Sequence, residues 1–244
     1  MPIPRFISFI IPAWNEESVL DPTLEALTVV ARHLDVPSEV IVADDSSTDR
    51  TAEIARQRGA RVVSVQHRQI SATRNAGARE AQGDLLIFVD ADTIVTPQVV
   101  CAAIEAVRAG AIGGGCAIRY SGRIPAYLRA FIPIEVWFAQ KMRMAFGCFL
   151  FCTREAFGVV GGFDSTIYAT EEVTMSLALQ RQGRFVCLRE CVSTSGRKLR
   201  THSTIEWFIQ IYRITFARRR YIRDRDAMGV WYGDRRPDPE LTKP

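Results

Sequence analysis

The chain has 244 residues, 48% of them hydrophobic and 24% charged, a composition that is ordinary for a folded globular protein and that excludes intrinsic disorder. Its 31 Lys and Arg residues outnumber its 27 Asp and Glu residues by four, and the excess is concentrated in residues 197–200 and 218–225. The sequence therefore predicts a local basic patch, which suits nucleic acid, anionic lipid or a phosphorylated substrate, rather than a basic protein throughout.

Cysteine usage and hydropathy bear on where the protein works. The six cysteines are scattered, and the sequence shows neither an N-terminal signal peptide nor a C-x-x-C pair. We expect buried thiols in a reduced, cytoplasmic protein, because the C-x-x-x-C pairs at 148/152 and 187/191 lack a further zinc ligand at supporting spacing. No apolar run reaches the roughly 18–20 residues of a membrane span, so any membrane contact is expected to be peripheral.

The first hundred residues alternate between strand and helix patterns. Buried β-type runs predict strands at 5–13, 38–45, 60–65 and 84–92. Apolar residues at helical spacing predict helices over 16–34, 47–59 and 71–83, the second of them capped by Ser47 or Thr48. This alternation predicts an α/β fold with a mostly parallel sheet and helices on both faces.

The pattern loosens after residue 100. Strands are predicted at 111–120 and 184–191, a strand and a short helix within 147–163, and helices over 171–183 and 204–220. An apolar, aromatic and basic stretch at 124–146 is interrupted by Pro133. Because no internal repeat or low-complexity linker divides the chain, we expect one domain with a tail.

Polar clusters follow three of the predicted strands. The first strand runs into PAWNEE (12–17), the second ends in Asp44-Asp45, and the fourth ends in Asp90-Ala91-Asp92. Since ligands of parallel sheets bind beyond the carboxyl ends of the strands, we expect these clusters to meet at one edge. Two carboxylates at i and i+2 suit Mg²⁺ or Mn²⁺, which takes few protein oxygens and leaves positions for phosphate.

The second strand end has a nucleotide interpretation. Asp44-Asp45 could accept hydrogen bonds from a nucleobase or a ribose, as an acidic residue after the second strand does in dinucleotide-binding folds. The first strand, however, is not followed by the G-x-G-x-x-G loop of those folds. The sequence therefore argues against a nicotinamide or flavin enzyme.

These motifs, in this order, resemble family 2 of the inverting nucleotide-sugar glycosyltransferases, which have the GT-A fold. The resemblance runs through IIPAWNEE (10–17), VADDSSTDRT (42–51), ISATRNAGAREAQGDLLIFVDADT (70–93), GGFD (161–164) and TEEVTMSLALQRQGR (170–184). It implies a single GT-A domain over 1–200, with a nucleotide-sugar-binding half at 1–115 and an acceptor half at 116–200. A C-terminal helical basic tail would follow at 201–244.

Carried over residue by residue, the resemblance implies a set of nucleotide-sugar contacts: Pro12, Ala13, Glu16, Asp45, Arg74, Asp90 and Asp92. Asp45 would hold the base, Arg74 would lie near the base or the phosphate, and Asp90 would bond the ribose. Asp92 would coordinate a Mg²⁺ or Mn²⁺ ion that bridges the diphosphate and screens the charge on the departing nucleoside diphosphate. Asn75 and Gly77 are interpreted as packing elements of their helix.

The sequence departs from the family pattern at two places. Glu171-Glu172 stands where members commonly have Glu-Asp, whose Asp is the general base. Adjacent carboxylates raise one another's pKa, which would bring a base nearer to neutrality, although both could also only cap the following helix. The Q-x-x-R-W motif of processive synthases is replaced by TSGRKLRTHS, whose Arg197, Lys198 and His202 either reach the diphosphate or lie in a solvated loop.

The sequence thus predicts a metal-dependent inverting glycosyltransferase. The donor would be a UDP-, GDP- or dTDP-sugar, the cofactor Mg²⁺ or Mn²⁺, and the acceptor a hydroxyl of a glycan, a small molecule or a lipid-linked molecule. Transfer onto a polyprenyl phosphate, and nucleotide-sugar binding without turnover, are the alternatives. Nucleic acid is not an expected partner, and the expected location is the cytoplasm or the cytoplasmic face of a membrane.

The predicted helix over 204–220 leaves two interpretations open. Its apolar residues lie on most faces, with one stripe of Trp207, Ile211 and Ile214 and another of Phe208, Tyr212 and Phe216, and three arginines, Arg218 to Arg220, end it. Either the helix is buried against the domain, or it lies on a membrane with its aromatic residues in the interface and its arginines on anionic headgroups.

Overall fold

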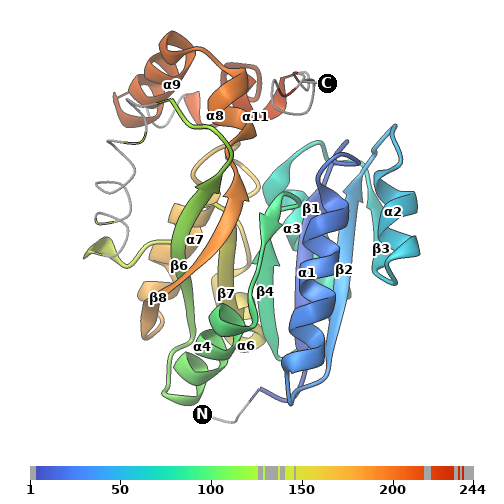
Figure 1. The fold of residues 1–244 in the computed structure, drawn as a ribbon. Coiled ribbons are helices and arrows are strands. Elements are labelled where there is room, and N and C mark those ends of the chain that lie inside the picture. Colours follow the sequence, from blue (N-terminus) through green and yellow to red (C-terminus); the bar gives the residue numbers. More distant parts are fainter. Residues whose placement is uncertain are drawn as a thin grey trace.

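A curled, mixed sheet organises the protein (Figure 1). The structure is a computed structural model that describes residues 4–125, 141–145, 147–216 and 221–233, and the single residues Arg129, Trp137, Arg236 and Asp238. In these residues the strand order is β3-β2-β1-β4-β7-β6-β8-β5. The expected α/β fold with a mostly parallel sheet is confirmed.

The nucleotide-binding half expected from the sequence is built from parallel strands. The strands are β1 (Ile7–Ala13), β2 (Ser38–Asp45), β3 (Arg61–Val65) and β4 (Leu85–Val89), and α1 (Leu20–His33), α2 (Thr51–Gln57) and α3 (Ile70–Glu80) connect them. Every residue of β4 is buried, as its unbroken apolar sequence predicts for a strand covered on both faces. Ala13 at the end of β1 pairs with Asp44 at the end of β2, so the polar segments that follow these strands start at the same edge.

The other half of the sheet is mixed. Its strands are β5 (Thr93–Ile94), β6 (Gly113–Ser121), β7 (Phe149–Thr153) and β8 (Phe185–Ser195). β7 runs antiparallel to both β4 and β6, whereas β8 runs parallel to β6. The two-residue strand β5 pairs with β8 through Thr93 and Thr194, which ties the segment after Asp92 to the far side of the sheet.

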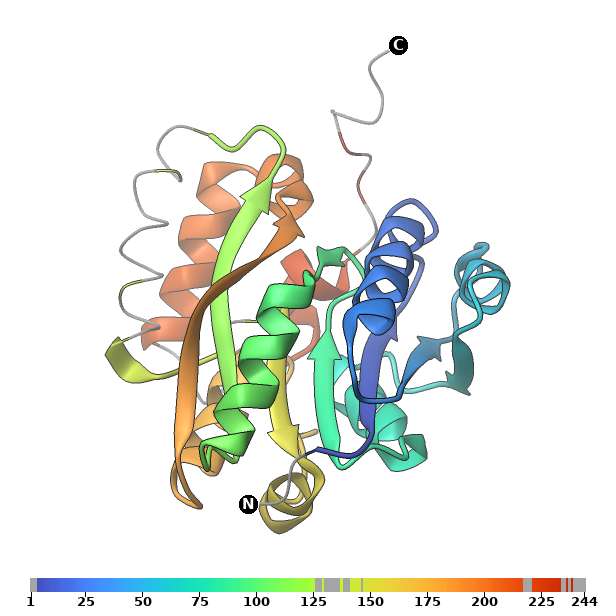
Figure 2. The same ribbon diagram turned by 60° about the horizontal axis from the view of Figure 1, so that its bottom comes forward.

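Helices cover both faces of the sheet (Figure 2). On one face α1 and α4 (Pro97–Arg108) pack on the sheet through one cluster of buried apolar side chains. On the other face α3, α6 (Arg154–Val160) and α7 (Glu171–Gln180) pack through a second cluster. Gly77 lets α3 approach β1 closely, because a Cβ atom there would stand 2.6 Å from Ile10 Cγ2. Gly77 and Asn75, which bonds the backbone of Phe163 in both directions, are packing residues as predicted.

The C-terminal elements lie at the end of the sheet where β1 and β2 end, with α8 and α9 above β6 and β8 (Figure 1). They are α8 (Arg197–Thr201), α9 (Thr204–Phe216), the 3₁₀ helix η1 (Asp226–Met228) and α11 (Gly229–Tyr232). Ile222 and Met228 form a small buried cluster with Ile167 and Ala169. The described helices include none that is long and apolar enough to cross a membrane. Arg218 to Arg220 and most of residues 124–146 lie outside the described residues.

Two local predictions are wrong. Neither Ser47 nor Thr48 caps α2, which begins at Thr51, because Asp49 accepts the Thr51 N–H at 3.0 Å and Ser47 Oγ instead accepts the N–H of Asn15. The strand predicted at 184–191 continues to Ser195, since its pairing with β6 extends to Ser121.

Candidate active site

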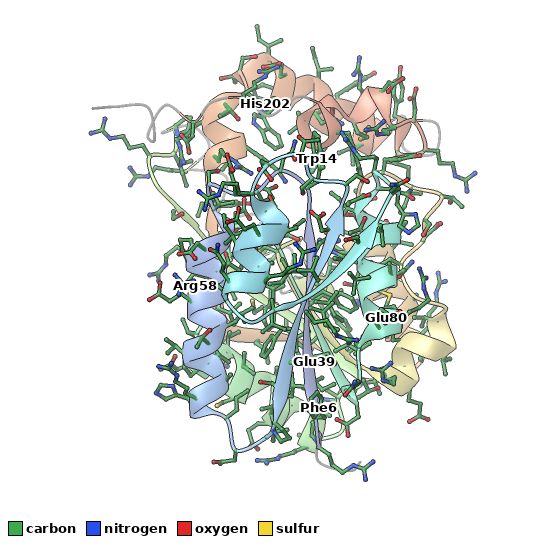
Figure 3. The ribbon with its side chains drawn as sticks, turned by 90° about the vertical axis from the view of Figure 1, so that its right-hand side faces the viewer. Phe6, Trp14, Glu39, Arg58, Glu80 and His202 are labelled. Atoms are coloured by element: carbon green, nitrogen blue, oxygen red, sulfur yellow. The ribbon has the colours of Figure 1, made fainter. Side chains whose placement is uncertain are left out.

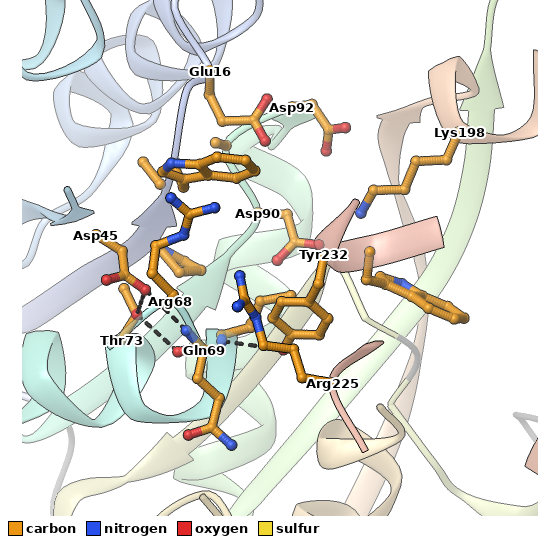
Figure 4. A pocket seen from close by; sticks show the side chains of 16 residues that line it. Glu16, Asp45, Arg68, Gln69, Thr73, Asp90, Asp92, Lys198, Arg225 and Tyr232 are labelled. Atoms are coloured by element: carbon orange, nitrogen blue, oxygen red, sulfur yellow. Dashed lines mark hydrogen bonds between the residues drawn. The ribbon is translucent and has the colours of Figure 1, made fainter. Parts of the chain in front are cut away.

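A pocket opens at the carboxyl edge of β1, β2 and β4 (Figure 4). It is lined by residues from the three strand ends, the start of α3 and the C-terminal elements: Pro12, Ala13, Trp14, Glu16, Asp45, Arg68, Gln69, Ile70, Thr73, Asp90, Ala91, Asp92, Lys198, Arg225, Trp231 and Tyr232. Six of the sequence-predicted contacts, namely Pro12, Ala13, Glu16, Asp45, Asp90 and Asp92, are therefore brought together in one cavity.

Asp45 fixes one wall of this pocket. Its carboxylate accepts hydrogen bonds from the N–H groups of His67 at 2.7 Å and Gln69 at 3.0 Å, and from Thr73 Oγ1 at 2.7 Å. These bonds hold the segment after β3 and the first turn of α3 against the end of β2. Because an ionised carboxylate offers about four lone-pair sites, Asp45 keeps capacity for one more donor from a ligand.

Trp14 and Arg68 form a flat, cationic surface in the pocket. The Arg68 guanidinium lies over the Trp14 ring, 3.7 Å from its centroid. The loop that carries Trp14 is held by Asn15, whose N–H donates to Ser47 Oγ at 2.9 Å and whose Oδ1 accepts the Thr48 N–H at 2.8 Å. Such a stacked pair is a surface on which a planar base can lie.

The acidic side of the pocket holds Asp90, Asp92 and Glu16, with Lys198 opposite them. Burial is the main cause that raises the pKa of Asp92 to about 6, and the charges of Asp90 and Glu16 raise it further while Lys198 lowers it. The Lys198 side chain extends towards the two aspartates (Figure 4). Thr194 Oγ1 donates to Asp92 at 3.3 Å, so the pairing of β5 with β8 also positions this carboxylate.

Arg74 joins the pocket to a second, buried group of carboxylates. Its side chain is 2% exposed and donates to Asp90 at 2.7 Å, to Glu172 at 2.7 Å and to Glu171 at 3.2 Å. Burial and then the charge of Glu172 raise the pKa of Glu171 to about 8, although Arg74 opposes the shift. Glu172 holds the closer contact with Arg74. The raised pKa of Glu171 favours its protonated form at neutral pH.

Arg74, Glu171 and Glu172 do not line the pocket itself. Glu171 and Glu172 are both buried, in the first turn of α7. The two glutamates that were expected to supply the general base therefore lie behind Asp90. The Arg74 guanidinium lies between Asp90 and Glu172.

Arg197 and His202 also lie off the pocket, at the same end of the molecule. Arg197 binds Glu16 at 2.7 Å and so holds that carboxylate. His202 Nδ1 lies 3.1 Å from the carbonyl oxygen of Lys198, its ring packs on Trp207, and burial lowers its pKa. Figure 3 shows His202 above Trp14, at the end of the molecule opposite Phe6. The roles in ligand binding that the sequence suggested for Arg197 and His202 stay predictions.

The C-terminal segment lines one side of the pocket. Arg225, Trp231 and Tyr232 line it, and the Tyr232 hydroxyl accepts the N–H of Ile70 at 3.3 Å. Burial, followed by the charge of Glu171, raises the pKa of Tyr232. Trp231 packs edge-on against Trp207 of α9, with 6.0 Å between the ring centroids. Part of the region that was expected to be a tail is thus a wall of the site.

The sequence profile of glycosyl transferase family 2 matches residues 8–160, which includes the strand ends that supply the predicted contacts. The chain belongs to glycosyltransferase family 2.

Curated sugar transferases match part of the chain. An undecaprenyl-phosphate 4-deoxy-4-formamido-L-arabinose transferase of Edwardsiella ictaluri is 33% identical over an alignment of 117 residues that covers 43% of this chain and 35% of that protein. A 4,4'-diaponeurosporenoate glycosyltransferase of Staphylococcus haemolyticus is 43% identical over an alignment of 93 residues that covers 35% of this chain and 24% of that protein. The chain thus matches about a third or less of the length of these two relatives.

Solved structures of glycosyltransferases share the fold. The mannosyltransferase PcManGT from Pyrobaculum calidifontis, in complex with GDP-Man and Mn²⁺, superposes with a TM-score of 0.64 at 17% identity, over 85% of this chain and 60% of that one. At this identity the likeness shows the fold, which is of the GT-A type that the sequence predicted.

Several pocket residues of this family 2 chain were not among the predicted contacts. Trp14 stands inside the quoted PAWNEE motif, and Arg68 and Gln69 follow β3, so the rule that ligands bind beyond strand ends could have found all three. Lys198 was considered with its neighbours and is the member of that group that reaches the pocket. Arg225, Trp231 and Tyr232 carry no local signal, because their place depends on packing against residues far away in the sequence.

Proposed function

We propose that this protein transfers one sugar from a nucleoside diphosphate sugar to an acceptor, with inversion at the anomeric carbon. The observation that carries the proposal is the convergence of Asp45, Asp90 and Asp92, from the ends of two strands, in one pocket with the Trp14–Arg68 stack. This pocket offers a surface for a base, acceptors for the donor groups of a nucleoside, and a charged end for a diphosphate.

The donor would lie across the pocket from Arg68 to Lys198. Its base would rest on the Trp14–Arg68 stack and donate to Asp45, and its ribose would donate to Asp90. Lys198 would supply positive charge to the diphosphate. The GDP-mannose complex of PcManGT, a protein of the same fold, supports a nucleotide-sugar donor.

The residues of the pocket fit a divalent cation, which Asp92 would hold. Burial is the main cause that raises the pKa of Asp92, and the charges of Asp90 and Glu16 raise it further, so a bound cation would stabilise the ionised carboxylate. Among the described residues no group of three or more His, Cys, Asp or Glu side chains forms a ready metal cage. Mg²⁺ and Mn²⁺ do not need one, because diphosphate and water supply their other ligands. When bound, the ion would screen the charge that develops on the departing diphosphate.

Glu172 is the proposed general base for a hydroxyl acceptor. Arg74 donates to its carboxylate at 2.7 Å, which is closer than the 3.2 Å contact of Arg74 with Glu171. The acceptor hydroxyl would have to reach Glu172 past Arg74, since a base works only within hydrogen-bond distance of the proton that it takes. Attack from the face opposite the leaving diphosphate would then invert the anomeric centre.

Transfer onto a polyprenyl phosphate is the second candidate. Burial of Glu171 and Glu172 away from the pocket favours it, because a phosphate acceptor is already an anion and needs no strong base. A relative that is named as an undecaprenyl-phosphate sugar transferase supports the same acceptor class.

Thermal shift with nucleoside diphosphates tests the donor site. UDP, GDP, dTDP and their sugars are added with and without Mn²⁺, and a donor that binds the native state selectively should raise the melting temperature. One nucleotide should stand out, and Mn²⁺ should increase its effect. Unchanged melting with all three diphosphates in the presence of Mn²⁺ would overturn the proposed function.

A further inference from the structure

The outward face of α9 presents a row of large apolar side chains to solvent. Ile205 is 71% exposed, Phe208 61%, Ile209 45% and Tyr212 63%. Their spacing of three, four and seven residues places them within about a 100° arc of the helix. Among the residues that the structure describes, these are four of the eight exposed large hydrophobic side chains, so the apolar surface is concentrated on this helix.

The opposite face of α9 is packed against the protein. The Trp207 ring packs edge-to-face against Trp231. Gln210 is buried, with its Nε2 3.0 Å from Met228 Sδ. Burial against the domain, one of the two interpretations that the sequence left open, therefore holds for this face of the helix. One side holds the pocket wall, and the other carries the exposed apolar row.

The charge around the row is positive. Between Arg197 and Arg225 the sequence has nine arginine or lysine residues and two acidic residues, Glu206 and Asp224. Arg197 and Arg200 pair with Glu16 and Asp238, and Lys198 and Arg225 line the pocket, so the basic residues that count for the row are the other five: Arg213, Arg218, Arg219, Arg220 and Arg223. Glu206 is the acidic residue of α9, and Arg236 binds it at 2.6 Å, which offsets its charge. Three of the arginines, Arg218 to Arg220, directly follow α9 in the sequence. An apolar stripe within a basic region is complementary to an anionic lipid surface, where apolar side chains enter the interface and cations meet the headgroups.

The row lies at the active end of the molecule. α9 stands over the same sheet edge as α8 and α11 (Figure 1), and one helix turn carries both the exposed Phe208 and Trp207, which contacts the pocket residue Trp231. A surface that covered the row would therefore lie close to the pocket. A second copy of the chain would bring the same positive charge to this face, which disfavours a symmetric dimer there.

We infer that the outward face of α9 docks the protein on an anionic bilayer. The four apolar side chains enter the headgroup region, the basic sequence of this region favours anionic headgroups, and the pocket stays at the membrane surface. The inference deepens the second candidate function, since such a surface would deliver a lipid-linked acceptor. Docking itself requires no turnover.

Vesicle flotation tests the inference. The protein is mixed at low salt with vesicles of equal parts phosphatidylcholine and phosphatidylglycerol, and the floating fraction is compared with that at high salt. We expect flotation at low salt and release at high salt, because salt screens exposed charges. Phe208→Ser should lower partitioning by roughly tenfold, since burying one such side chain is worth about one decade of affinity or more.

Matched variants make the result specific. Val159→Ser changes an equally exposed apolar residue on α6, far from α9 in the sequence, and should float like the wild type. Replacing Arg218 to Arg220 with glutamine should reduce binding to anionic vesicles. The inference is wrong if the wild type stays in the soluble fraction at low salt, or if Phe208→Ser floats like Val159→Ser. It is also wrong if sedimentation shows a dimer that Phe208→Ser dissociates, because the row would then cover a second copy.

The donor-binding thermal shift is measured on the same variants. Failure of flotation with nucleotide binding intact overturns the docking surface alone. If the wild type shows no thermal shift with any nucleoside diphosphate, the proposed function is overturned whatever the flotation result.

Discussion

The hydroxyl of Tyr232, in α11, accepts a hydrogen bond from the backbone N–H of Ile70, the first residue of α3. The two residues stand 162 positions apart, and both line the pocket. The first N–H groups of a helix have no partner within the helix, so the Tyr232 oxygen satisfies a donor that α3 cannot satisfy by itself. The hydrogen bond thus connects the C-terminal segment to the first turn of α3, which Asp45 also holds through Gln69 and Thr73.

Tyr232→Phe should therefore destabilise the protein modestly. Loss of one hydrogen bond costs about 1 kcal/mol, which lowers the melting temperature by roughly 2–4 °C in a chain of this size. Differential scanning calorimetry without ligand measures it. Tyr168→Phe, which alters the ring that packs edge-on against Tyr232 but not the Ile70 contact, is the matched control and should melt like the wild type. Equal melting of both variants would show that the Tyr232 hydroxyl contributes nothing.

Asp92→Asn should keep the fold and lose the metal-dependent part of nucleotide binding, because an amide cannot supply the anionic oxygen that Mg²⁺ or Mn²⁺ requires. Isothermal titration with the best diphosphate, with and without Mn²⁺, measures this. Asp35→Asn, an exposed carboxylate on the loop after α1, is the control and should leave the Mn²⁺ effect intact. An undiminished Mn²⁺ effect in Asp92→Asn would move the cation to another residue.

Glu172→Gln should leave donor binding unchanged and slow transfer by roughly two to four orders of magnitude, the usual contribution of a general base. Glu171→Gln is the matched variant and should slow transfer less, since Glu171 already carries a proton at neutral pH. The rate at which labelled sugar is transferred from the donor to the acceptor is measured for both variants. The reverse ranking would make Glu171 the base, and full activity of both variants would favour a phosphate acceptor.

Glu171 also makes stability depend on pH. Its pKa in the folded state is about 8, above the ordinary value of a glutamate, so the folded protein binds more protons than the unfolded chain between these values. The stability present at low pH is therefore lost as the pH rises towards 8. Glu171→Gln removes this loss. The melting temperature of the variant minus that of the wild type should therefore increase as the pH rises from 5 to 9. A constant difference across that range would mean that Glu171 is ionised throughout.

The strand ends were predictable because their signals are local. An unbroken apolar run predicts a buried strand such as β4, and the polar residues that follow parallel strands meet at one edge whatever the details of packing. The place of Arg74 was not predictable in this way. Its partners Glu171 and Glu172 are 97 and 98 residues away, and burial of a guanidinium among three carboxylates depends on how α3 and α7 pack.

The part of the pocket formed by residues 225–232 was not predictable either, because it too depends on packing between segments that are distant in the sequence. Its sequence has no strong periodicity, and its position depends on contacts of Ile222 and Met228 with Ile167 and Ala169. The exposed row on α9 was predictable only in part, since the sequence has apolar residues on most faces and only the packing of Trp207 and Gln210 decides which face turns inward.

The positions of the tryptophans allow intrinsic fluorescence to report on both the pocket and the exposed row of α9. The chain has four tryptophans, of which Trp14 and Trp231 line the pocket and Trp207 links Trp231 to the helix with the exposed row. A base laid on Trp14 would change the stacking of that ring, whereas insertion of α9 into lipid would act on the Trp207–Trp231 pair. Intrinsic fluorescence of one variant that keeps only Trp14 and of another that keeps only Trp207 and Trp231 can therefore follow occupancy of the two surfaces separately, without any attached dye.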